Sequence, residues 1–167
     1  VNTTLRANLD RVLCTGNLSA LTTQVMLSVA LPLDAGDLVT SLTFVSATTA
    51  AGTPTNWWFA LYSPAGALLS QSADATSTAW GANTVKTLNL TSAYTVPASN
   101  IYYASIMVKA TTPPTLLGHT THAYSSSSWL TGGAVLAQTS GSALTDTAPA
   151  TIASGSAVAT VPRVVLS

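Results

Sequence analysis

The sequence predicts an all-β protein: an antiparallel β-sandwich, jelly-roll-like, of about eight strands. One observation is that short runs of apolar residues alternate with polar or small ones, as in strands with one buried face. Another is that Gly, Pro, Asn and Asp separate these runs at intervals of about 10–15 residues. In addition, no run of ten or more residues shows the 3.6-residue period of an amphipathic helix.

The densest apolar run, WWFALY at residues 57–62, is the expected centre of the fold. Alternate residues of a strand point to opposite faces, and here both sets are apolar. We therefore expect one face to belong to the core and the other to be covered by the loop 118–133 or by a neighbouring subunit. The turn residues Pro64, Ala65 and Gly66 predict a hairpin that returns through residues 67–72.

The rest of the chain reads as further strands joined by polar connections. The remaining predicted strands are residues 22–33, 38–47, 85–90, 101–110, 134–139 and 157–166. Residues 140–157 are small and polar and show no period. Residues 1–20 also lack a clear period, so we expect an N-terminal arm or anchor segment, followed by a single β-sandwich domain at 21–167.

Charge is scarce. Charged residues make up 6% of the chain and the formal net charge is zero, whereas roughly 25% is usual in globular domains. Such a chain has no electrostatic footprint for nucleic acid, and it has no apolar run of the ~20 residues that a membrane span needs. A surface with so little charge is poorly protected against association, which favours a protein that functions in an assembly.

No residue pattern indicates catalysis, a metal or a cofactor. His119 and His122 form H-x-x-H, but a zinc site needs three or four ligands, and the chain has one cysteine and no glutamate. Asp34 and Asp37 flank a turn, and calcium would require six to eight oxygen ligands. No G-x-S-x-G elbow and no converging carboxylate pair mark an active site. Cys14 is expected to act as a small hydrophobic residue.

Three aromatic residues in polar stretches are the candidates for surface recognition: Trp80, Tyr124 and Trp129. Exposed aromatic rings beside Ser, Asn and Gly suit sugar stacking or a protein interface. The alternative is that they fold back over the ends of the sandwich, because Trp is mostly buried in proteins.

Several stretches follow one another in a characteristic succession: DAGDLVTSLTFVS (34–46), TNWWFALYS (55–63), AWGANTVKTL (79–88), and YTVP (94–97) leading into IYYASIMV (101–108). This succession resembles β-sandwich virion proteins of tailed bacteriophages that infect actinobacteria, of the capsid decoration, head-fibre or minor tail type. The resemblance covers roughly residues 25–117. It implies location in the virion, assembly with other virion proteins and with further copies of the chain, for example as a trimer, and contact with the host surface.

Three hypotheses about function therefore stand. The first is a non-enzymatic structural protein of the virion, in which residues 1–20 attach to a partner. The second is a carbohydrate-binding module that recognises host cell-wall glycan through Trp80, Tyr124 and Trp129. The third is a hydrolase on a jelly-roll scaffold, which would require Asp and His side chains to cluster in the fold.

Overall fold

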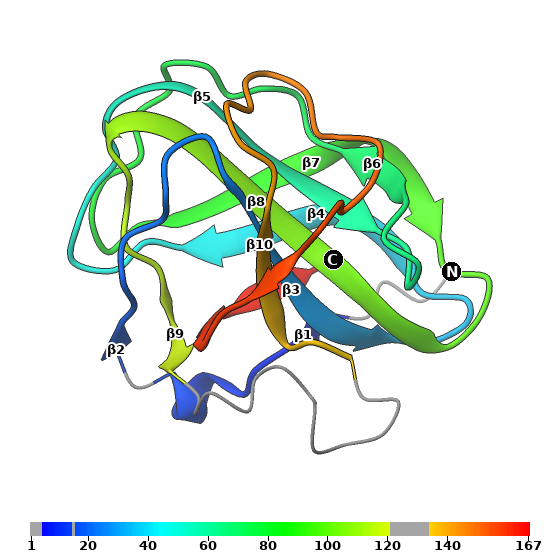
Figure 1. The fold of residues 1–167 in the computed structure, drawn as a ribbon. Coiled ribbons are helices and arrows are strands. Elements are labelled where there is room, and N and C mark those ends of the chain that lie inside the picture. Colours follow the sequence, from blue (N-terminus) through cyan, green and yellow to red (C-terminus); the bar gives the residue numbers. More distant parts are fainter. Residues whose placement is uncertain (1–4, 15, 121–133) are drawn as a thin grey trace.

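The computed structural model describes residues 5–14, 16–120 and 134–167 (Figure 1). It consists of antiparallel sheets packed against one another, which confirms the predicted all-β sandwich. The described residues include one short 3-10 helix, η1 (Arg11–Leu13), and no helix that could span a membrane.

Two large sheets form the sandwich. The six-stranded sheet has the order β11 (Ser156–Ala157), β10 (Ala137–Ser140), β3 (Met26–Leu33), β8 (Asn100–Thr112), β5 (Gly52–Tyr62), β6 (Leu68–Gln71). The four-stranded sheet has the order β1 (Arg6–Ala7), β13 (Val164–Leu166), β4 (Leu38–Val45), β7 (Val85–Thr95). The chain crosses between the two sheets from β3 to β4, β4 to β5, β6 to β7 and β7 to β8, which is a jelly-roll-like alternation.

A smaller sheet lies beside the sandwich, with the order β12 (Thr160–Pro162), β9 (Leu117–Thr120), β2 (Gly16–Asn17). It corrects two expectations. The start of the predicted loop 118–133 is strand β9, and the predicted strand 157–166 is divided between β12 and β13 in different sheets. Gly118 explains why β9 was missed: a Cβ there would lie 2.2 Å from the Val161 carbonyl oxygen, so the position requires glycine despite its low strand propensity.

The main core lies between the two large sheets and is centred on aromatic rings. Phe44 on β4 and Phe59 on β5 bring the sheets together, with ring centroids 4.8 Å apart. Trp57 and Trp80 pack against Phe59, each with its ring centroid 5.8 Å away. The buried indole groups remain hydrogen-bonded, since Trp57 Nε1 donates to the Thr78 carbonyl and Trp80 Nε1 to the Thr84 carbonyl.

The outer face of β5 is covered by residues 141–152, drawn in orange in Figure 1. Trp58 Nε1 donates a hydrogen bond to the Thr145 carbonyl, and the Tyr62 hydroxyl donates one to the Pro149 carbonyl, both at 2.8 Å. The face is therefore buried, as expected, but by a segment that showed no period in the sequence. The observed cover is this segment. Most of the predicted cover 118–133 lies outside the described residues, and cover by a neighbouring subunit stays a prediction.

The described part of residues 1–20 lies on the sandwich. Strand β1 pairs with β13, strand β2 pairs with β9, and Leu18 belongs to the main core. The sheets therefore extend across the expected border at residue 20. The role of this segment as an attachment to a partner stays a prediction.

Candidate functional site

The residues examined for metal or covalent chemistry do not gather in the described part of the chain, where no group of three or more His, Cys, Asp or Glu side chains could hold a metal ion. His119 lies on β9, with its Nδ1 3.1 Å from the Leu13 carbonyl oxygen, and His122 lies outside the described residues. Cys14 is a half-buried free thiol, and desolvation raises its pKa.

The structure corrects one of the three predicted recognition residues. Trp80 is only 1% exposed, because the side chains of Trp57 and Phe59 from β5 enclose its indole. It therefore offers no surface for stacking a sugar. Tyr124 and Trp129 lie outside the described residues, so their role in recognition stays a prediction.

A specific set of polar contacts involves Arg6, which sequence reasoning did not identify. Its guanidinium binds Asp37 through both carboxylate oxygens, with Nε 2.9 Å from Oδ2 and Nη2 3.2 Å from Oδ1. Arg6 Nη2 also lies 2.5 Å from Asp34 Oδ2. We call this group of three residues the Arg6 clamp. Because Arg6 contacts both carboxylates, the turn at 34–37 binds a guanidinium.

The turn is built to present these carboxylates. The Asp34 backbone N–H donates to Asp37 Oδ2 at 3.0 Å, and Gly36, at φ +91°, donates to the Val96 carbonyl at 2.8 Å. The Asp37 side chain is only 8% exposed. The hydrogen bond from Arg6 is the main reason why the pKa of Asp37 lies below its usual value.

Residues after Arg6 continue along β13, where Ala7 is in register with Val165. Asn8 is bound at both ends of its side chain: Nδ2 donates to the Pro162 carbonyl at 2.9 Å, and Oδ1 accepts from the Val164 N–H at 2.8 Å. Arg163 Nε donates to the Leu9 carbonyl at 3.2 Å. We refer to β13, residues 162–163 and the 34–37 turn together as the N-terminal seat.

Large apolar side chains are exposed on either side of this bound segment. Leu5 is 70% exposed, Val12 80% and Leu13 52%. Among the described residues, only Val85 and Leu136 are further large hydrophobic side chains in this class, so three of the five lie within residues 5–13. Isolated exposed apolar residues are normal, but Val12 and Leu13 are neighbours on η1, and adjacent exposed apolar side chains are candidates for contact with a partner.

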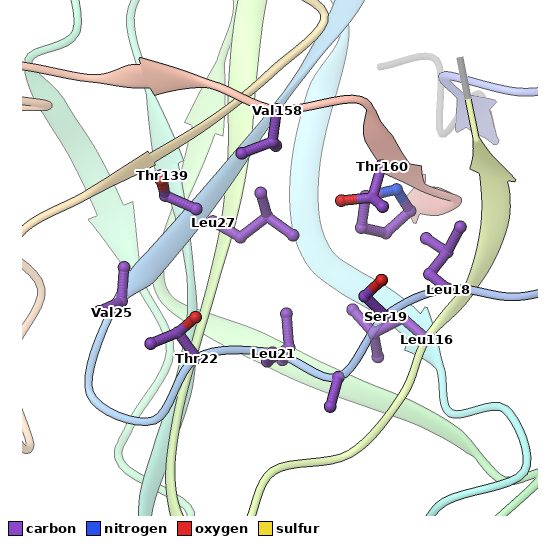
Figure 2. Close-up of a pocket in the computed structure, with 12 residues that line it drawn as sticks. Leu18, Ser19, Leu21, Thr22, Val25, Leu27, Leu116, Thr139, Val158 and Thr160 are labelled. Atoms are coloured by element: carbon purple, nitrogen blue, oxygen red, sulfur yellow. The ribbon is translucent and has the colours of Figure 1, made fainter. Parts of the chain in front are cut away.

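A small apolar pocket lies where residues 18–25 pass β10 and β12 (Figure 2). Its volume is about 120 Å³, and the side chains of Leu21, Leu27 and Val158 are directed towards the same space. Its lining includes no ionisable residue. Pockets for drug-sized ligands hold about 300–1,000 Å³, so this one suits a single small apolar group.

No known family model and no curated protein matches this chain. The candidate site therefore rests on its geometry, which combines a bound N-terminal segment with exposed apolar residues beside it. A signal for Arg6 did exist in the sequence, because the chain has only five basic residues and the Asp34-x-x-Asp37 pair has few possible partners. Asn8 carries no comparable signal.

Proposed function

We propose that this chain is a non-enzymatic structural protein of a bacteriophage virion, a capsid decoration, head-fibre or minor tail component that assembles with other virion subunits. The observation that carries the proposal is the set of apolar side chains exposed in residues 5–13: Leu5, Val12 and Leu13. Exposed apolar residues of this kind gain free energy when a partner covers them. Because the chain carries few charges, electrostatic repulsion between subunits opposes association only weakly.

The resemblance to actinobacteriophage virion proteins supports the same proposal. The rest of the fold also leaves the N-terminal segment as a place for partners to bind. The two faces of β5, which contains the longest continuous apolar run, are both covered by the chain itself. Partners would therefore bind at sheet edges, connections and residues 5–13 rather than on the large apolar surfaces.

The chain offers a matched set of variants to test the proposal. Val12→Ser and Leu13→Ser together would remove apolar surface from η1, whereas Val85→Ser removes a 60% exposed side chain from β7 as a control. Changes at such exposed positions usually alter the free energy of unfolding by no more than about 0.5 kcal/mol. Any effect on assembly would then report on the surface rather than on folding.

The experiment is quantitative mass spectrometry of gradient-purified particles of the phage that encodes this chain. We expect the chain at a fixed ratio to the major capsid or tail protein, the paired Val12→Ser and Leu13→Ser variant incorporated poorly, and the Val85→Ser control incorporated normally. Recovery of the native chain only in the soluble fraction would refute the structural role.

The alternative proposal, a module that binds host cell-wall glycan, would depend on Tyr124 and Trp129, because Trp80 is buried. Stacking on a sugar requires an accessible aromatic face. Titration with host cell-wall polysaccharide tests it: Trp129→Ala should weaken binding, and an unchanged affinity would refute this site.

A further inference from the structure

We propose that the N-terminal seat binds the N-terminal segment of a second copy, so that neighbouring subunits exchange residues 5–9. In the assembly, β1 of one subunit would pair with β13 of the next, and its Arg6 would bind Asp34 and Asp37 there. This inference rests on the proposed function in one respect, which is that copies of the chain lie close together in the particle.

The seat has the properties of a specific receptor for this segment. It recognises an arginine through two carboxylates, an asparagine through a paired donor and acceptor, and the backbone between them through strand pairing. The contacts join the segment to residues at least 28 positions away in sequence. Because they do not depend on the chain that links the two parts, the segment of another copy can make the same contacts.

Opening the connection between the segment and the rest of the chain requires little free energy. Residues 10–13 are all exposed, and η1 contains no buried residue. Its backbone N–H bonds run from Leu13 to the Asp10 carbonyl at 3.0 Å, from Cys14 to the Arg11 carbonyl at 3.3 Å, and from Val12 to Asp10 Oδ1 at 3.4 Å. Two further contacts would also open: Cys14 Sγ lies 3.8 Å from the Asp10 carbonyl oxygen, and His119 Nδ1 lies 3.1 Å from the Leu13 carbonyl oxygen. Water can replace such exposed bonds at little cost. The five residues 10–14, fully extended, reach about 17 Å.

The exposed apolar residues give a reason for a second copy to occupy the seat. In a single closed chain, Leu5, Val12 and Leu13 remain in water on either side of the seated segment. Exchange preserves the seat contacts and brings the two connections 10–14 together, where Val12 and Leu13 of both copies can pack against each other. An empty seat is unfavourable, since it leaves the largely buried carboxylate of Asp37 without its arginine.

A disulfide experiment separates exchange from the closed chain. Ala7 and Val165 are register partners on neighbouring antiparallel strands, and such pairs have Cα atoms about 4.5–5.5 Å apart, within the range that a disulfide bridges. Two variants are made in a Cys14→Ser background: one carries Ala7→Cys and the other Val165→Cys. Neither can form this bridge within one chain. The two are co-expressed, allowed to assemble and oxidised.

We expect a covalent heterodimer of the two variants on a non-reducing denaturing gel. The control pairs Ala7→Cys with Thr87→Cys, at an exposed position of β7, and should give little product. The inference is overturned if no heterodimer forms while a single chain carrying both Ala7→Cys and Val165→Cys closes its own bridge. That result, in particles that contain the chain, would leave the structural role intact. Absence of the chain from particles would refute that role independently of the gel.

Discussion

The cover over the outer face of β5 can be tested with a one-atom change, Tyr62→Phe. The Tyr62 side chain is fully buried, and its hydroxyl donates a 2.8 Å hydrogen bond to the Pro149 carbonyl in segment 141–152. Removal of the hydroxyl keeps the ring packed but leaves that half-buried carbonyl without its donor. A change of this kind lowers the free energy of unfolding by about 1 kcal/mol. In a chain of this length, a loss of that size lowers Tm by about 2–4 °C.

The assay is equilibrium urea unfolding followed by circular dichroism, with Tyr103→Phe as the matched control. Tyr103 lies in the same buried cluster, and its hydroxyl has no hydrogen-bond partner among the described residues. The control should therefore change the free energy of unfolding by less than about 0.5 kcal/mol. If the two variants were equally stable, segment 141–152 would not be bound to Tyr62 in solution, and the reasoning about the covered face would be refuted.

Three other perturbations follow from the buried groups. Phe59→Asp should abolish cooperative unfolding because it places a carboxylate among the core aromatic rings. Thr87→Asp, at an exposed position of β7, is the control and should fold. A sharp melting transition for Phe59→Asp would contradict this expectation. Ser28→Ala should cost about 1–3 kcal/mol, because it leaves the buried Ser105 hydroxyl unpaired, and the double variant with Ser105→Ala should recover most of the loss in urea titrations; additive losses would argue against the pair. The folded pKa of Asp37 is lowered, so the native chain should have a higher free energy of unfolding than Asp37→Asn above about pH 4. This difference should disappear as the pH falls through the folded pKa of Asp37. A difference that persists in strong acid would contradict the Arg6 clamp.

The sequence was sufficient to predict the strands that carry alternating or continuous apolar residues. Residues 57–62 were expected to be covered on both faces, and they are. Their cover was not predictable, because segment 141–152 binds Trp58 and Tyr62 through backbone carbonyls. Backbone groups leave no mark in the composition, so a stretch of small polar residues gives no sign of such a role.

The candidate site was harder to predict for a related reason. Trp80 sits in a polar stretch, and its apolar surroundings come from Trp57 and Phe59, which are distant in sequence. Strand β1 has only two residues, too few to show a period, and its partner β13 lies at the other end of the described chain. Pairings of this kind depend on the tertiary fold. The one indication in the sequence was that few basic residues were available to pair with Asp34 and Asp37.

The most direct test of the proposed structural role is a cryo-electron microscopy map of the particle at a resolution that shows side chains. The account predicts density for this sandwich at repeated, symmetry-related positions, with Leu5, Val12 and Leu13 buried against a neighbouring subunit. A particle without such density, or one in which these three side chains face solvent while another surface makes every contact, would contradict it.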